Sequence, residues 1–189
     1  NKLKIKTLLI NLPANLNKNS DTIIQPYGLA IISSVLKQRK HDVTLFDASA
    51  YQYNKDSILQ YVMKQKPRIL GITCMTNNLG QTIGFLKDVK KYIPDLITVL
   101  GGPHPTIEYE SLLNNHSDVD IACIGEGEYT MLEIVENIQN NTPLDNVKGI
   151  AFRLDGKIKV NPIREYINNL DSLPFADWDS LPMDRYFFQ

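Results

Sequence analysis

Cysteine is scarce in this sequence, and its apolar runs are short. Cys74 and Cys123 are the only cysteines among 189 residues, and neither belongs to a C-x-x-C pair. The chain therefore encodes no zinc or iron–sulfur site of its own, and thiols inside such apolar stretches are typical of buried, reduced cysteines in a cytoplasmic protein. No run approaches the ~20 apolar residues of a membrane helix, and residues 1–13 read as a first strand rather than a signal peptide.

An excess of charge of one sign is also lacking. Lysine and arginine total 20 against 21 acidic residues, and the basic residues are scattered. A protein that binds nucleic acid or a membrane surface gathers its basic residues in a stripe or patch, so we expect neither partner. Sequence motifs of several enzyme classes are missing too: there is no G-x-S-x-G elbow and no P-loop. Asn11 and Cys74-Met75 stand where a receiver domain needs its aspartates.

What the sequence does contain is a regular alternation of strand and helix patterns. Short apolar runs predict strands at 7–12, 42–46, 68–74, 96–101 and 119–125. Periodic apolar residues predict helices at 26–40, 55–65, 83–93 and 129–139, with a short helix around 112–113. This alternation predicts an α/β fold, a flavodoxin-like (Rossmann-like), doubly wound parallel sheet of five strands in the order 2-1-3-4-5.

The pattern changes near residue 146. Residues 1–145 form the predicted α/β domain, and residues 146–165 read as a β-hairpin extension around Asp155-Gly156. Residues 166–189 have two prolines, an aromatic end and no sustained period, so we interpret them as a linker tail. Either the chain is the N-terminal part of a longer protein, or this tail folds back on the sheet.

The candidate site lies at the carboxyl ends of the strands, where sheets of this kind bind ligands. The loops that reach this edge are 13–25, 75–79, 101–106 and 125–128. In the third loop, Gly101 and Gly102 would let a ligand approach the backbone, while Pro103 and Pro105 would hold His104 in a fixed direction. The alternative is a plain turn before the next helix, with His104 solvated or capping.

Two further groups of residues sit at the same edge. Gly125, Glu126 and Gly127 follow the fifth strand, although acids at a helix start also suit the helix dipole alone. The side chains of Thr73, Thr76, Asn77 and Asn78 could hydrogen-bond a ribose, a phosphate or an amide, or Thr76 or Asn77 could simply cap a helix. The 13–25 loop is long enough for a lid, but an asparagine-rich surface excursion is equally consistent with it.

Four segments resemble one family. They are QPYGLAIISSVLKQRKHDVTLFDA, with Lys40 where the family has glycine, GGPHPT, IGEGE, and LDSLPFADWDSLPMDRY. The chain resembles the cobalamin-binding domain that precedes the catalytic barrel in cobalamin-dependent radical S-adenosylmethionine (SAM) enzymes. That group includes the anaerobic magnesium-protoporphyrin monomethyl ester cyclase and many methyltransferases.

The resemblance implies cobalamin at the carboxyl edge, with the corrin over the loops and the nucleotide tail between strands and helices. It assigns ligand-wall roles to Gly101, Gly102, Pro103, His104, Gly125, Glu126 and Gly127, and hydrogen bonds near the tail to Thr73 and Thr76. The implied partner is a radical SAM domain of the same full-length chain, which would hold SAM and a [4Fe-4S] cluster. Because this chain lacks C-x-x-x-C-x-x-C, we expect it to bind cofactor without catalysing a reaction alone.

One departure concerns the cobalt. Some relatives carry D-x-H-x-x-G after the first strand, and none of the three histidines here fits that pattern. We therefore predict no imidazole ligand from the 13–25 loop, and expect His104 to contact the corrin rim or tail. The rival hypothesis is a stand-alone flavodoxin-like domain that binds a nucleotide or a protein without any corrin.

Overall fold

One mixed sheet organises the chain, and its strands follow the predicted order. The structure, a computed structural model, describes residues 4–16 and 23–186. The parallel strands lie in the order β2-β1-β3-β4-β5, as predicted. Their bounds are β1 (Lys6–Asn11), β2 (Asp42–Asp47), β3 (Ile69–Thr73), β4 (Ile97–Gly101) and β5 (Ile121–Cys123).

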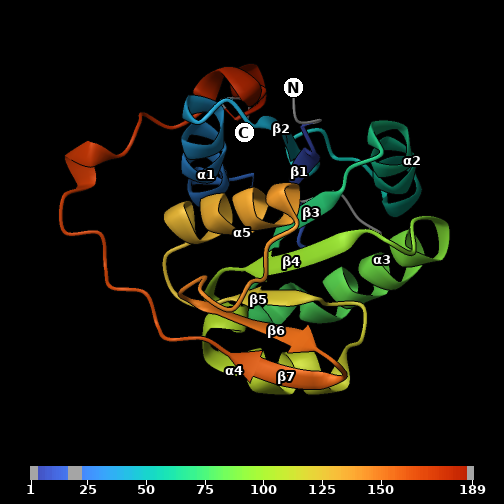
Figure 1. Ribbon diagram of the computed structural model, residues 1–189. Helices are drawn as coiled ribbons and strands as arrows, with labels where there is room; N and C mark the ends of the chain where they lie inside the picture. Colours follow the sequence, from blue (N-terminus) through green and yellow to red (C-terminus); the bar gives the residue numbers. More distant parts are fainter. Residues whose placement is uncertain (1–3, 17–22, 187–189) are drawn as a thin grey trace.

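The predicted hairpin is confirmed, and it extends the same sheet. Strands β6 (Ile150–Leu154) and β7 (Lys157–Val160) pair with each other in antiparallel fashion. Strand β6 also pairs antiparallel with β5, so seven strands of the described residues form one sheet. Figure 1 shows the two strands of the hairpin beyond β5, at the edge of the sheet opposite β2.

Five helices cover the sheet on both faces, as expected of a doubly wound fold. Helices α1 (Tyr27–Gln38) and α5 (Glu128–Asn140) lie on one face. The other face carries α2 (Lys55–Gln65), α3 (Leu79–Tyr92) and α4 (Pro103–Asn115). Short 3-10 turns complete the chain at η1 (Thr76–Asn78), η2 (Leu170–Ser172), η3 (Trp178–Ser180) and η4 (Met183–Arg185).

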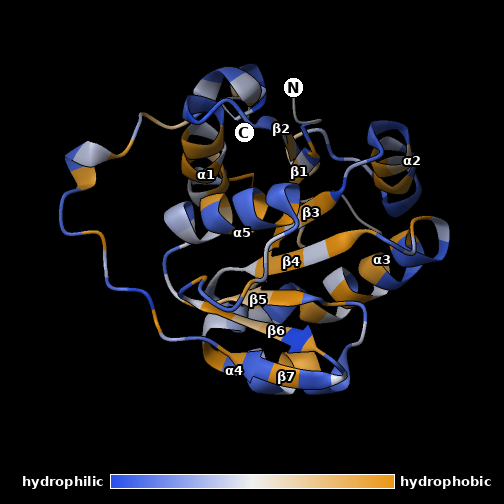
Figure 2. Cartoon of the chain, viewed as in Figure 1, coloured by the Kyte–Doolittle hydropathy of each residue, from blue (hydrophilic) through white to orange (hydrophobic). Residues whose placement is uncertain are grey.

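Alternate residues of the inner strands enter two separate cores. Leu8 and Ile10 pack under α2, α3 and α4, whereas Leu9 between them packs under α1 and α5. Successive strand side chains point to opposite faces, and both faces are covered, so the strands read as continuous apolar runs. The hydropathy colouring of Figure 2 shows this, with orange strands between helices that are blue on their outer sides.

Two local predictions need correction. The short helix expected around residues 112–113 is the end of the longer α4, which begins at Pro103. Pro103, His104 and Pro105 are therefore helical residues rather than a loop, because proline fits the first turn of a helix, where its missing N–H costs nothing. Lys40, which stands at the family's glycine position, takes a φ of 60°, a left-handed conformation that glycine adopts most readily.

The tail folds back on the domain. The Asp177 backbone N–H donates to the carbonyl of Ala30 in α1, at 3.1 Å, and Leu181 is buried in the core beneath α1 and α5. The Asp177 carboxylate accepts hydrogen bonds from Ser33 Oγ at 2.5 Å and Lys37 Nζ at 2.7 Å. Within the described residues, no helix is long and apolar enough to cross a membrane.

The end of the tail reaches the sheet itself. Tyr186 donates its hydroxyl hydrogen to Asp47 Oδ2 at 2.5 Å, at the carboxyl end of β2. Burial raises the pKa of the Asp47 carboxyl, and hydrogen bonds from Tyr186, Asn11 and the backbone act in the opposite direction. The tail is thus joined both to α1 and to the last residue of β2.

Candidate ligand-binding site

A cavity of about 420 Å³ opens at the carboxyl edge of the sheet, between α1 and α5. Its walls come from β1, β3, β4 and β5, from the loop after β5, and from the starts of the two helices. The lining residues are mostly apolar, as in most pockets that hold small molecules. They are Leu9, Pro26, Tyr27, Gly28, Leu29, Ile32, Gly71, Ile72, Thr73, Val99, Gly101, Gly102, Cys123, Gly125, Glu126, Gly127, Glu128 and Met131.

The floor of the cavity follows from the register of three strands. Leu9 lies beside Gly71, and Gly71 lies beside Val99, so the three residues form a row on the α1 and α5 face. A side chain at Gly71 would place its Cβ 2.7 Å from Leu9 Cδ2 and 3.5 Å from Met131 Cε. Because Gly71 has no side chain, the space above the middle of the cavity floor stays open.

Six of the ten predicted site residues line this cavity. They are Thr73, Gly101, Gly102, Gly125, Glu126 and Gly127. The remaining four, Thr76, Asn77, Pro103 and His104, are not among the lining residues. The predicted loops do meet at one edge of the sheet, because the strands before them are parallel neighbours.

Gly102 also has a role inside the fold. Its φ is 101°, and an added Cβ would lie 3.0 Å from both the carbonyl oxygen of Cys74 and Thr73 Oγ1. The chain needs this close approach, because the His104 backbone N–H donates to the Cys74 carbonyl at 3.2 Å. Gly102 thus joins the end of β3 to the start of α4, whether or not a ligand touches it.

His104 is held within the protein rather than presented to the cavity. Its side chain is buried in the first turn of α4, and its Nδ1 lies 3.1 Å from Thr76 Oγ1. Thr76 and Asn77 are exposed in η1, and the residue that caps this turn is Asn78, whose Oδ1 accepts from the Met75 N–H at 2.9 Å. Contact of His104, Thr76 or Asn77 with a corrin stays a prediction.

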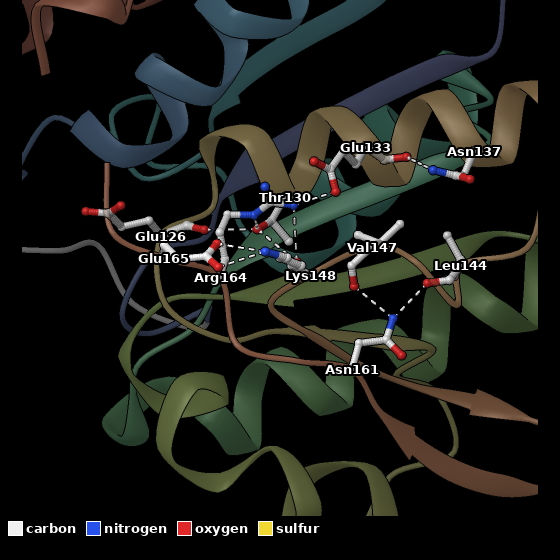
Figure 3. A network of polar contacts seen from close by, with 10 residues as sticks. All are labelled: Glu126, Thr130, Glu133, Asn137, Leu144, Val147, Lys148, Asn161, Arg164 and Glu165. Carbon is white, nitrogen blue, oxygen red and sulfur yellow. Dashed lines mark hydrogen bonds and ion pairs between the residues drawn. The ribbon is translucent and has the colours of Figure 1, made fainter. Parts of the chain in front are cut away.

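Glu126 connects the cavity to the segment after the hairpin. Its Oε2 accepts a hydrogen bond from the Ile167 backbone N–H at 2.7 Å. Three residues earlier in the chain, Arg164 donates hydrogen bonds to Thr130 Oγ1 at 2.9 Å and to Glu133 Oε2 at 2.5 Å. Both of these acceptors belong to residues of α5 (Figure 3). The start of the tail is therefore attached to the helix that forms one wall of the cavity.

The two cysteine thiols near the cavity are weakly reactive. Both cysteines are free and buried, as predicted, and burial raises the pKa of Cys74 to about 11 and of Cys123 to about 12. A thiol with such a pKa stays protonated and is a poor nucleophile. Among residues 4–16 and 23–186, no group of three His, Cys, Asp or Glu side chains is placed to hold a metal ion.

Several lining residues were not predicted from the sequence. Glycine weakens a strand interior, so Gly71 in the middle of RILGITC was the available signal. Leu9, Ile32 and Met131 gave no such signal, because an apolar residue that lines a cavity has the same sequence pattern as one that fills a core. Of the long 13–25 loop, residues 17–22 lie outside the described residues.

Comparison with known proteins shows the family. The B12 binding domain matches residues 16–135, which is well over half of the chain. The chain belongs to the B12-binding domain family. An uncharacterized methyltransferase of Pyrococcus horikoshii is 30% identical over 187 residues, covering 97% of this B12-binding domain and 40% of the relative. The anaerobic magnesium-protoporphyrin IX monomethyl ester cyclase of Rubrivivax gelatinosus is 30% identical over 168 residues, covering 86% and 30%.

Solved structures share the fold of this B12-binding domain. The cobalamin-dependent S-adenosylmethionine radical enzyme OxsB, with aqua-cobalamin and S-adenosylmethionine bound, superposes with a TM-score of 0.78 at 22% identity, covering 93% of this chain and 24% of that one. The radical S-adenosylmethionine methyltransferase TsrM of Kitasatospora setae, with cobalamin and a [4Fe-4S] cluster bound, gives 0.71 at 16% identity, covering 92% and 31%. The domain spans 30–40% of the length of the two curated relatives named above.

Proposed function

We propose that this chain is the cobalamin-holding N-terminal part of a radical SAM enzyme of the methyltransferase or oxidative cyclase type. The observation that carries the proposal is the cavity at the carboxyl edge, whose lining residues apart from Leu9 all lie in the region that matches the B12-binding domain. Residues 166–189 would then lead toward a radical SAM domain that supplies SAM and the iron–sulfur cluster. Cobalamin, when bound, supplies a cobalt centre that can carry a methyl group or an electron.

The residues present fit part of this cofactor. A cavity of about 420 Å³ lies within the usual range for small-molecule sites, roughly 300–1,000 Å³. It suits the nucleotide tail rather than the larger corrin ring, and the low floor at Gly71 gives a flat group room between the sheet and α5. Leu9, Ile32, Val99 and Met131 would surround this group with apolar side chains and exclude water.

The carboxyl edge of the sheet beside the cavity offers surface for the larger part of the cofactor. Large apolar side chains are exposed after three of the parallel strands: Ile24 and Tyr27 follow β1, Met75 follows β3, and Ile107 follows β4. Their exposed fractions run from 53% to 75%. A flat macrocycle lying across this edge would cover apolar surface that water now contacts.

The histidines are consistent with the prediction about the cobalt. His104 interacts with Thr76, while His41 precedes β2 and His116 ends α4, both at the opposite edge of the sheet. We therefore propose that no histidine of the described residues serves as an axial ligand. In the cobalt(II) protein, we expect the electron paramagnetic resonance spectrum, including any nitrogen splitting from the cofactor's own base, to be unchanged by His104→Ala.

A reconstitution experiment tests the proposal. The purified chain is mixed with hydroxocobalamin, passed through a gel-filtration column, and examined by absorption spectroscopy. We expect retained corrinoid, and about tenfold weaker binding for Gly71→Ala, because its Cβ would press against Leu9 and fill the floor. Gly84→Ala is the matched control, since an added Cβ on α3 meets nothing within 4 Å.

Two results would contradict the proposal. A wild-type chain that folds but retains no corrinoid would favour the stand-alone domain, for which nucleotides are then the ligands to test. For the link to radical chemistry, the gene sequence after residue 189 is decisive. A C-x-x-x-C-x-x-C motif should appear within about one further domain length, roughly 100–150 residues, and its absence would refute the assignment.

A further inference from the structure

The floor of the cavity is made of apolar side chains. Leu9, Gly71 and Val99 form it, in the middle of β1, β3 and β4. Met131 of α5 faces this row, since a Cβ added to Gly71 would lie 3.5 Å from Met131 Cε. The side chains of Leu9, Val99 and Met131 are at most 3% exposed. The space above Gly71 is therefore bounded by hydrocarbon and thioether groups.

The polar lining side chains stand elsewhere in the cavity. Apart from Cys123, those of the described residues are Tyr27, Thr73, Glu126 and Glu128. Tyr27 and Glu128 are the first residues of α1 and α5, Thr73 is the last residue of β3, and Glu126 belongs to the loop after β5. These four residues thus lie where their elements reach the carboxyl edge, and not in the middle of the strands that form the floor.

Neither the backbone of the floor nor the nearby thiol replaces such polar side chains. Strand β3 pairs with β1 on one side and with β4 on the other, so its backbone N–H and C=O groups are used within the sheet. Cys123 lines the cavity, but a thiol is only a weak hydrogen-bond donor and acceptor. A polar group placed on the floor would therefore give up its hydrogen bonds to water and find no strong partner among the described residues.

We propose that this cavity selects corrinoids by the base of their nucleotide tail, and takes an apolar benzimidazole in preference to a purine. The inference rests on the proposed function and names the class of cofactor that the cavity accepts. Dimethylbenzimidazole, the base of cobalamin, has a hydrocarbon edge with two methyl groups, which apolar side chains can cover. Adenine has an exocyclic amino group and several ring nitrogens, and burying these groups without partners weakens binding.

The first test compares three corrinoids on the wild-type protein by absorbance titration. They are cobalamin, the analogue with adenine as its base, and cobinamide, which has no nucleotide. Excess cyanide occupies both faces of cobalt, so neither base is held by the metal. We expect cobalamin to bind about tenfold to hundredfold more tightly than the adenine analogue. Cobinamide should also bind more weakly than cobalamin, because it leaves the apolar floor uncovered.

A glutamine variant tests the floor directly. Glutamine has nearly the length of methionine, and its amide offers the donor and the acceptor that pair with an edge of adenine. We therefore expect Met131→Gln to lower the preference for cobalamin by about tenfold. Met63→Gln is the matched control, because Met63 lies on α2, which covers the other face of the sheet. The ratio of the two affinities is measured on one protein sample, so a loss of stability affects both corrinoids alike.

A second variant covers the case in which Met131→Gln does not fold. Val99→Thr keeps the shape of the side chain and adds one hydroxyl group to the floor, so it should shift the ratio in the same direction by a smaller factor.

Three results would overturn the inference. They are equal binding of cobalamin and the adenine analogue by the wild type, the same affinity ratio in Met131→Gln and Met63→Gln, and cobinamide binding as tight as that of cobalamin. The last result would mean that the base lies outside the cavity. All three leave corrin binding intact, whereas a folded wild-type protein that binds none of the three corrinoids would refute the proposed function itself.

Discussion

The two faces of the sheet are built from alternate residues of the same strands, and the cavity at the carboxyl edge opens on the face covered by α1 and α5. On the face covered by α2, α3 and α4, Leu8, Ile10 and Leu70 are completely buried. On the face covered by α1 and α5, Gly71 lies between Leu70 and Ile72 in sequence and forms the floor of a cavity of about 420 Å³.

This difference shows how a fold can provide a site without losing its core. A glycine inside a strand has no side chain to pack, so it weakens the strand. Strand β3 tolerates Gly71 because it is central, with parallel neighbours β1 and β4 on its two sides. The side chains packed under α2, α3 and α4 stabilise the fold, and the face under α1 and α5 provides the cavity.

The largest effect should come from opening the packed face. We expect Leu70→Ala to lower the free energy of unfolding by about 3 kcal/mol, because Leu70 is completely buried among α2, α3 and α4 side chains. Urea unfolding measures this loss, and corrinoid retention should persist while the variant is folded. Val99→Ala, on the cavity face, should cost less than half as much, and equal losses at the two positions would remove the distinction between the faces.

A smaller effect should follow from releasing the tail. Asp177→Ala removes the acceptor for Ser33 Oγ and Lys37 Nζ on α1, and should destabilise the protein by about 1–2 kcal/mol. Limited proteolysis should cut residues 168–176 faster in this variant. Asp171→Ala, in the same tail but exposed, is the control. Unchanged proteolysis would show that Asp177 does not hold the tail on α1.

The smallest effect concerns the ion pairs of Asp88 on the surface of α2 and α3, the helices that cover the packed face. Lys55 of α2 and Lys91 hold the pKa of Asp88 at about 2, below its ordinary value of 3.8. Because the folded-state pKa is lowered, the carboxylate stabilises the fold above pH ~4, and this contribution disappears as the pH falls toward about 2. The free-energy difference between wild type and Asp88→Asn, below about 1 kcal/mol at this surface site, should therefore shrink between pH 6 and pH 3.

The control for this pH effect is Asp42→Asn, at an exposed carboxylate. If the Asp88 variant behaved as the Asp42 variant does, the two lysines would not be stabilising the Asp88 carboxylate.

The sequence predicted the sheet well because buried parallel strands have a distinct apolar pattern. The strand order, the hairpin and the edge that carries the cavity all followed from this pattern and from chain connectivity. The start of α4 was missed because Pro103 and Pro105 indicate a loop in most contexts, and only the turn at Gly102 makes them the first turn of a helix. How the hairpin continues the sheet through β5 depends on pairing between distant residues.

The site was predicted at its rim and missed at its floor. Gly101, Gly125 and Gly127 belong to recognisable glycine-containing loops, and all three line the cavity. Which face Gly71 serves depends on strand register and on the position of α1 relative to α5. His104 was assigned to the ligand through the family resemblance, while its hydrogen bond to Thr76 depends on how η1 sits beside α4.

The two outer strands of the sheet have a consequence for the behaviour of the protein in concentrated solution. An open edge offers unpaired backbone groups that can recruit a strand from another molecule and start aggregation. At one edge, β7 carries Lys157 and Lys159, and a charged edge strand discourages such pairing. At the other edge, η3 of the tail lies against β2, and Tyr186 binds Asp47 at its end. A variant that releases the tail would therefore expose an edge strand as well as loosen α1. We expect such a variant to self-associate before it unfolds.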